Sequence, residues 1–287
     1  MAESQLFRVA GLTFRVEGNL PPMANMEPFR VAEAGEELLF NLRLESSFPP
    51  VLARPVYKTD DGPGFPEIAI GELPEGGYSF RVSPLPGRPL SGELRIAPGV
   101  REAQMVLAGT DDSFALNNAL MLLFTFASAD KGALEMHSSV VTNGGKAYMF
   151  LGKSGTGKST HSRQWLESIP GTELLNDDNP IIRLEADGTV RVYGSPWSGK
   201  TPCYRNASAP VGAIVRIRQC PENRISRLSV VESYASVYSS CSGLKFYKSM
   251  ADAIHSTLEG VVLGVPCYVL DCRPDHDAAR VCHEAVV

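Results

Sequence analysis

The stretch FLGKSGTGKST, residues 150–160, decides how the second half of the chain is interpreted. It satisfies the pattern G-x-x-x-x-G-K-[ST], the phosphate-binding loop or Walker A motif. Glycines let consecutive backbone N–H groups of such a loop turn inward, where they form a nest for anionic oxygens at the positive N-terminus of a helix. The stretch therefore predicts that the chain binds the phosphates of a nucleotide.

The loop residues are expected to share the binding of ATP and Mg²⁺. Lys158 would supply a mobile positive charge to the β- and γ-phosphates, and the Ser159 hydroxyl is the expected magnesium ligand. The remaining expected nucleotide contacts come from Gly152, Ser154, Gly155, Thr156, Gly157 and Thr160. Lys153 occupies a variable position of the motif and is expected to face solvent. The alternative interpretation is a glycine turn that precedes a helix by chance.

The sequence on both sides of the loop favours the nucleotide interpretation. Upstream, ALEMHSSVVTNGGKAYMFL contains two apolar, β-branched runs around Asn143-Gly144, a dipeptide typical of tight hairpins. Downstream, STHSRQWLESIPG predicts a helix that stops at Pro170-Gly171. A strand, a glycine loop and a helix in this order are the context that the motif requires.

A phosphate loop needs further groups before it can transfer a phosphoryl group. In ELLNDDNPIIRL, residues 173–184, Asp177 and Asp178 follow a short apolar strand whose end is expected beside the loop. One carboxylate of such a pair can bind magnesium while its neighbour acts as the base for an acceptor hydroxyl. The alternative is an acidic turn ahead of Asn179-Pro180.

The segment MHSSVVTNGGKAYMFLGKSGTGKST followed by LLNDDNP resembles the catalytic domain of HPr kinase/phosphorylase. That family has a histidine ahead of a hairpin, then a P-loop, then a double-aspartate motif, and it shares its fold with phosphoenolpyruvate carboxykinase. The resemblance implies that His137 lies near the transferred phosphoryl group. It also implies that Asp177 is the general base and that Asp178 is its metal-associated partner. Without the resemblance, His137 would be interpreted as a hydrogen-bonded structural residue.

A looser similarity links CYRNASAPVGAIVRI to the family's Arg-Asn element, which would place Arg205 near the active site. An arginine there would neutralise a phosphoryl transition state, and the alternative is a surface-loop arginine. The chain departs from the family at Thr160, where a glutamate is usual, and it lacks an E-x-R-G-x-G signature between Asp178 and Arg205. The acceptor is therefore expected to be a hydroxyl, serine first, on a protein or a small molecule.

Two domains are expected. Residues 1–108 contain short alternating runs separated by Pro and Gly clusters, which predict a small domain rich in antiparallel strands. Residues 109–287 would form an α/β P-loop domain with a mixed sheet, of the HPr kinase and phosphoenolpyruvate carboxykinase type. This domain would begin with an apolar helix near Phe114. Strands are expected at 209–220 and 264–273, helices at 249–260 and 277–285, and a hairpin around Asp187-Gly188.

Composition excludes some classes of function. The net charge of −5 and the absence of a basic run argue against nucleic-acid binding. The most apolar segment, residues 115–127, is too short to span a bilayer and is expected to be a buried helix. The first residues do not have the pattern of a secretory signal, so a cytoplasmic location is expected. The six cysteines form no C-x-x-C pair, which argues against zinc.

Three functions stay open at this point. The preferred one is an ATP- and magnesium-dependent kinase, a phosphotransferase of the HPr kinase type. A phosphoenolpyruvate carboxykinase would share the loop and the aspartate pair, but residues 1–108 offer no evident metal cluster for that chemistry. A nucleotide-binding module that senses ATP without turning it over is the third. The resemblance also favours assembly as a homo-oligomer.

Overall fold

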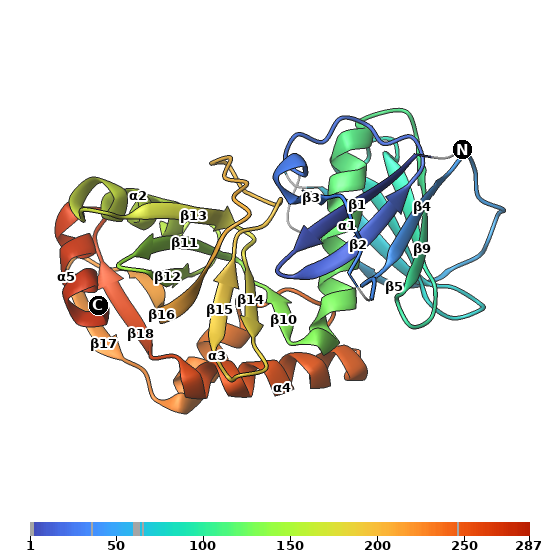
Figure 1. The fold of residues 1–287 in the computed structure, drawn as a ribbon. Helices are drawn as coiled ribbons and strands as arrows, with labels where there is room; N and C mark the ends of the chain where they lie inside the picture. Colours follow the sequence, from blue (N-terminus) through green and yellow to red (C-terminus); the bar gives the residue numbers. More distant parts are fainter. Residues whose placement is uncertain (1–2, 36, 60–63, 65, 246) are drawn as a thin grey trace. The chain divides into compact units, whose positions relative to one another are not determined.

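The computed structural model describes residues 3–35, 37–59, 64, 66–245 and 247–287. The chain divides into two compact units, Met1–Ala127 (unit 1) and Ser128–Val287 (unit 2) (Figure 1). It is an α/β protein with mixed sheets in which strands outnumber helices in the described part of the chain. Each unit is described by itself.

Unit 1 contains a sheet that has nine strands within the described residues. In spatial order these are β3 (Arg30–Val31), β1 (Ser4–Val9), β2 (Leu12–Glu17), β4 (Asn41–Glu45), β9 (Glu102–Leu107), β8 (Gly92–Ile96), β7 (Tyr78–Ser83), β6 (Glu67–Glu72) and β5 (Arg54–Lys58). The expected antiparallel hairpins are present, but β4 pairs in parallel with both β2 and β9. The sheet is therefore mixed. A short 3₁₀ helix, η1 (Glu27–Phe29), lies in the connection before β3.

The apolar helix expected near Phe114 is α1 (Asp112–Ser128), and it belongs to unit 1. Its side chains pack on the unit 1 sheet: the ring centroids of Phe124 and Phe14 are 6.2 Å apart, and those of Phe126 and Phe80 are 5.3 Å apart. Because this packing buries α1 against the strands of residues 1–107, the division falls after Ala127. The boundary predicted from the sequence, between residues 108 and 109, lies before this helix.

Unit 2 contains a mixed sheet in which several strands end at the same edge. Its strands are β10 (Ala133–Glu135), β11 (Ser138–Asn143), β12 (Lys146–Leu151), β13 (Glu173–Asp178), β14 (Ile181–Leu184), β15 (Val190–Tyr193), β16 (Ser208–Gln219), β17 (Arg224–Arg227) and β18 (Cys267–Cys272). β12, β16 and β18 are parallel, and β11 lies antiparallel between β12 and β13. The carboxyl ends of β12, β13, β16 and β18 therefore share one edge of the sheet.

Helices of unit 2 pack on this sheet, including the part formed by β10, β14 and β15. α2 (Lys158–Ser168) and α5 (His276–Val286) pack together against β11, β12, β16 and β18, around a core that includes Trp165 and Phe150 (Figure 1). α3 (Val230–Tyr238) packs on α4 (Lys248–Gly264), which contacts β10, β14 and β15. A 3₁₀ turn, η2 (Ala129–Lys131), precedes β10. Among the described helices, none combines the length and apolar character needed to span a bilayer.

The predicted local structure around the glycine loop is confirmed, with one shift in a turn. β11 and β12 form the expected hairpin, but the two turn residues are Gly144 and Gly145, with φ of 57° and 78°. Asn143 instead pairs with Lys146 and donates its side-chain amide to the Pro170 carbonyl. The hairpin at Asp187-Gly188 is also present, between β14 and β15. β17 and α3 were not predicted.

Candidate functional site

The glycine loop connects β12 to α2. At Gly152, an added Cβ would come within 2.3 Å of the Thr156 hydroxyl, so the tight return of the chain requires glycine there. Gly157 is the N-cap of α2, with φ of 101° and no side-chain hydrogen bond to the helix start. The first N–H groups of α2 are thus left without a side-chain cap, as an anion-binding helix N-terminus requires.

The buried Lys158 side chain reaches back over this loop. Its ammonium donates to the Gly152 carbonyl at 3.0 Å and lies 2.8 Å from His137 Nε2. Burial lowers the pKa of Lys158, while the charges of Asp178 and Asp177 act in the opposite direction. The predicted phosphate-binding lysine and the predicted histidine are therefore in direct contact.

His137 joins Lys158 to Asp178. Its Nδ1 lies 3.0 Å from Asp178 Oδ1, and its backbone N–H donates to the Ser240 carbonyl at 2.7 Å. Since the Lys158 ammonium can only donate, Nε2 is the acceptor and Nδ1–H donates to the carboxylate. Burial by itself raises the pKa of Asp178, but the hydrogen bond from His137, together with the charge of Lys158, outweighs it and lowers that pKa.

Asp177 has different neighbours. Its side chain is 4% exposed, and its Oδ1 accepts a hydrogen bond of 2.9 Å from the Ser159 hydroxyl. The resemblance expected Ser159 and Asp178 to hold magnesium together. The structure instead brings Ser159 to Asp177 and His137 to Asp178, because β13 ends at Asp178 and successive residues of a strand point in opposite directions.

The backbone at Asp178 is held in an unusual conformation. Its φ is 114°, which is uncommon for a residue with a Cβ. It forms an isolated bridge with Ser198, while Gly199 comes so close that an added Cβ would lie 3.0 Å from Asp178 Cβ. The Gly199 N–H also donates to the Asp177 carbonyl at 2.7 Å. The segment around Ser198 and Gly199 thus fixes where Asp178 lies, as often occurs at functional sites.

Two buried polar residues that were not predicted from the sequence, Asn176 and Ser195, form hydrogen bonds around the segment of Ser198 and Gly199. The fully buried Asn176 amide lies 3.2 Å from the Trp197 carbonyl, and the Ser195 hydroxyl donates to the Asn179 carbonyl at 2.6 Å. SPWSGKTPCY, residues 195–204, belongs to the connection between β15 and β16. Residues 195–197 are buried, whereas Lys200 is exposed. Asn176, a polar residue inside an apolar strand, was the signal that could have indicated this network.

Arg205 does not join the cluster. Its guanidinium donates to the Leu174 carbonyl and to Glu173 Oε2, both at 2.7 Å. Glu173 is the first residue of β13, and Asp178 is its last. Arg205 therefore lies at the opposite end of the strand from the aspartate pair.

A second arginine lies closer to the loop and was missed. Arg216 pairs across β16 and β12 with Leu151, the residue before Gly152. Its guanidinium is held at the end of α3 by the hydroxyls of Ser236 and Ser239, both at 2.7 Å, and of Ser240 at 3.0 Å. Burial lowers the pKa of Arg216, and the charge of Arg216 contributes to lowering that of Lys158. An arginine in an apolar strand belongs to no recognised motif, so no sequence pattern singled out Arg216.

The candidate cluster therefore consists of Lys158, Ser159, His137, Asp177 and Asp178. In the described part of the chain, no group of three or more His, Cys, Asp or Glu side chains could hold a metal ion by itself. The chain matches no protein-family model, and a comparison with curated proteins finds no significant relative.

Proposed function

We propose that unit 2 is an ATP-dependent phosphotransferase of the HPr kinase type, which transfers the γ-phosphoryl group of ATP to a hydroxyl. One observation carries the proposal: two consecutive residues at the start of α2 each connect to the aspartate pair. Lys158 does so through His137 at 2.8 Å, and Ser159 does so directly at 2.9 Å. A phosphate loop coupled to two carboxylates has the groups that phosphoryl transfer requires.

The arrangement of elements supports the same proposal. An antiparallel hairpin precedes the loop, the loop leads into α2, and the aspartate pair ends a strand two positions away in the sheet. This order agrees with the fold that the resemblance implies, that of HPr kinase and phosphoenolpyruvate carboxykinase.

Ser159 and Asp177 fit a magnesium site. Mg²⁺ usually binds through one or two carboxylates together with substrate phosphates and water, and both side chains offer oxygen atoms at 2.9 Å from each other. An ion bound there would neutralise charge on the β- and γ-phosphate oxygens. We therefore assign Asp177, rather than Asp178, to the metal. This reverses the assignment that the resemblance implies.

Asp178 is then the base. Its carboxylate is about one-third exposed and its depressed pKa keeps it ionised, so it can accept the proton of an entering hydroxyl. The acceptor oxygen forms a bond to the γ-phosphorus as the bond from that phosphorus to the β,γ-bridging oxygen breaks, and ADP leaves. His137 orients Asp178, and Lys158 places its charge at the transferred group. The acceptor is a protein or small-molecule hydroxyl.

Incubation of the purified chain with γ-labelled ATP, magnesium and fractions of cell extract tests this proposal. We expect a labelled acceptor, and we expect its labelling to disappear with Asp178→Asn. ATP binding without transfer to any fraction would favour the sensing module instead. Phosphoenolpyruvate formation that depends on oxaloacetate would identify a carboxykinase.

A further inference from the structure

Arg216 holds a positive charge that pairs with no acidic side chain in the described part of the chain. It is half-buried on β16, and its guanidinium is bound by neutral groups at the carboxyl end of α3. Nε donates to the Ser236 hydroxyl, and Nη2 donates to the Ser236 carbonyl and to the hydroxyls of Ser239 and Ser240. A charge that is partly removed from water is costly without a counter-charge, so this position favours an anion as ligand.

One nitrogen of the guanidinium is available to such a ligand. The four hydrogen bonds use Nε and Nη2, whereas Nη1 has no partner among the described residues. Nη1 is not one of the enclosed side-chain atoms that lack a partner there, so it keeps access to solvent. Because the guanidinium is a planar fork, these bonds also fix the direction of the Nη1 N–H groups. Arg216 can therefore bind an anionic oxygen and keep its present contacts.

Arg216 lies on the same face of the unit 2 sheet as Asp178. Arg216 is opposite Leu151 of β12, and Leu151 is opposite Ser138 of β11. Ser138 is in turn opposite Asp178, the last residue of β13. Opposite residues of neighbouring strands point to the same face of a sheet. The cation and the proposed base therefore share one face.

The proposed magnesium site lies on the other face. Asp177 is opposite Ser139, whose hydroxyl is 2.6 Å from that of Ser162 in α2. Asp177 itself accepts the hydrogen bond from Ser159 at the start of α2. Since α2 covers this face, we expect an acceptor to approach the base from the opposite face, where Arg216 lies.

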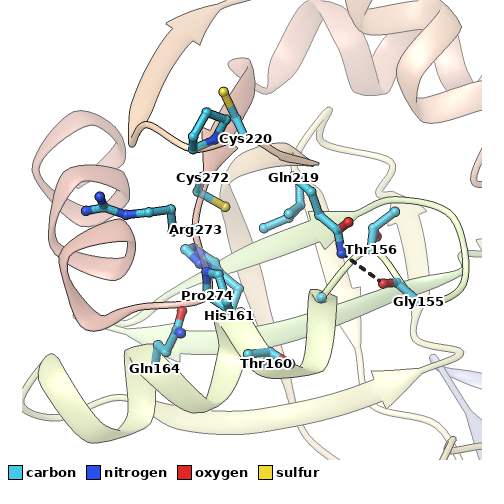
Figure 2. A pocket seen from close by; sticks show the side chains of 13 residues that line it. Gly155, Thr156, Thr160, His161, Gln164, Gln219, Cys220, Cys272, Arg273 and Pro274 are labelled. Atoms are coloured by element: carbon cyan, nitrogen blue, oxygen red, sulfur yellow. Dashed lines mark hydrogen bonds between the residues drawn. The ribbon is translucent and has the colours of Figure 1, made fainter.

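The cavity beside the glycine loop belongs to the α2 face as well. It measures about 540 Å³, and its lining includes Thr160 and Gln164 of α2 and Ile217 and Gln219 of β16 (Figure 2). Arg216 is not part of this lining, in agreement with the alternation of side chains along a strand. An anion bound by Arg216 therefore lies outside this cavity.

Ser240 joins Arg216 to the histidine that orients the base. Its hydroxyl accepts from Arg216 Nη2 at 3.0 Å, and its carbonyl accepts the backbone N–H of His137 at 2.7 Å. Arg216 and His137 are thus anchored to the same residue, a separation that a single acceptor molecule can span.

We propose that Arg216 binds an anionic group of the phosphoryl acceptor. The acceptor is then a compound that carries a carboxylate or a phosphate in addition to the hydroxyl that it presents to Asp178. Nη1 donates to an oxygen of the anionic group, and Asp178 accepts the hydroxyl proton during transfer. The inference rests on the proposed function and deepens it, because it names the chemical class of the acceptor.

Inorganic sulfate is a probe for the anion site that requires no knowledge of the acceptor. In protein loaded with magnesium and a non-hydrolysable ATP analogue, the phosphate loop is filled, so bound sulfate lies elsewhere. We expect calorimetry to show saturable sulfate binding that Arg216→Met weakens about tenfold or more, the effect of one charge-assisted hydrogen bond. The matched control is Arg218→Met on the same strand, because Arg218 is exposed and pairs with Asp271. Its sulfate affinity should stay unchanged.

Failure of the inference differs from failure of the proposed function. If the loaded protein binds no sulfate, or if Arg216→Met binds it as well as the control does, the inference is overturned. A loss of about tenfold or more in affinity for the ATP analogue in Arg216→Met would overturn it too, by assigning Arg216 to the γ-phosphate. If the unmodified protein does not bind the analogue, the proposed function is overturned, and the inference with it.

The acceptor labelled by γ-labelled ATP in cell extract gives a second test. We expect mass spectrometry to find a carboxylate or phosphate on it, and its KM to rise about tenfold or more in Arg216→Met. A labelled acceptor with neither group would overturn the inference and support the proposed function.

A purely structural role for Arg216 predicts a different pattern. A cation at the carboxyl end of α3 stabilises the helix, so Arg216→Met would lower thermal stability and leave sulfate affinity and the acceptor KM unchanged. Should Arg216→Met fail to fold, Arg216→Lys keeps a positive charge at this helix end but loses the guanidinium fork. We expect Arg216→Lys to weaken sulfate binding several-fold, and an unchanged affinity would overturn the inference.

Discussion

The Ser159 hydroxyl donates to the buried Asp177 carboxylate over 2.9 Å, and this bond ties the first turn of α2 to the end of β13. Asp178, the next residue, faces His137 at 3.0 Å. Two adjacent carboxylates thus have different neighbours, a hydroxyl for one and an imidazole for the other. Their contributions to the reaction can be separated by substitution.

Asparagine at each position should separate metal binding from proton transfer. We expect Asp177→Asn to raise the magnesium concentration needed for half-maximal transfer roughly 10- to 100-fold. Asp178→Asn should keep ATP and magnesium affinity and lose about 10²- to 10⁴-fold in transfer rate, since it removes the base. Magnesium titration of the labelling rate measures both. The reverse result would restore the assignment that the resemblance implies.

Lys158→Met should weaken ATP binding by about 10- to 100-fold, because it removes a charge-assisted contact to phosphate while keeping the length of the buried side chain. Isothermal calorimetry measures the effect. The matched control is Lys153→Met, in the same loop, since the Lys153 side chain is exposed as expected. Equal loss in both variants would indicate that net charge, rather than the position of Lys158, governs binding.

The pH profile should depend on His137. With His137 present, its hydrogen bond helps to hold the pKa of Asp178 below its ordinary value, so the base stays ionised as the pH falls. His137→Ala removes that hydrogen bond, so the pKa of Asp178 rises and the acid limb of kcat/KM moves to higher pH. His276→Ala, on the exposed side of α5, is the control. An acid limb that does not move would show that Asp178 is not the titrating base.

The local motifs were predictable because short-range chemistry determines them. The loop, its flanking strand and helix, and the position of Asp177 and Asp178 at a strand end all follow from residue types within a few positions of each other. The resemblance implied a position for His137 near the transferred phosphoryl group, and the structure shows its imidazole beside Lys158. These elements lie within residues 133–184.

Pairings between distant segments were not predictable in the same way. The parallel pairs of β4 with β2 and β9 depend on where the chain returns to the sheet, which no local pattern encodes. The approach of Gly199 to Asp178 was not predictable for the same reason. These residues lie 21 positions apart in the sequence and meet only when β13 has folded. Arg205 was expected at the site from the similarity of its Arg-Asn element. Such a similarity does not specify which end of a strand the arginine reaches.

Gly199→Ala should lower transfer without lowering ATP affinity. The added Cβ would lie 3.0 Å from Asp178 Cβ and 3.2 Å from its Cγ, so the carboxylate must move. We expect a loss in transfer rate of about tenfold or more, since small displacements of a reacting group are costly. Gly35→Ala is the control, because its Cβ would meet no atom within 4 Å. An unchanged rate would mean that the position of Asp178 does not limit the reaction.

The two arginines should respond differently. Arg205→Ala breaks an exposed ion pair with Glu173, so we expect transfer to be unchanged and stability to fall by less than about 1 kcal/mol. Arg216→Met leaves the Ser236, Ser239 and Ser240 hydroxyls without their cation and removes a charge that acts on Lys158. We expect it to lower transfer. Labelling rates and thermal unfolding measure both, and a strong effect of Arg205 alone would contradict the geometry.

The two tryptophans of the chain give the site a built-in optical readout. The Trp165 indole donates to His161 within α2, and the Trp197 carbonyl lies beside Asn176 and just before Ser198. Trp165 thus reports on α2, which begins at the glycine loop, and Trp197 belongs to the segment that approaches Asp178. In single-tryptophan variants, Trp165 emission would report changes in α2 after ATP is added, and Trp197 emission would report rearrangement around the aspartates. The order of binding steps could then be followed with no attached dye.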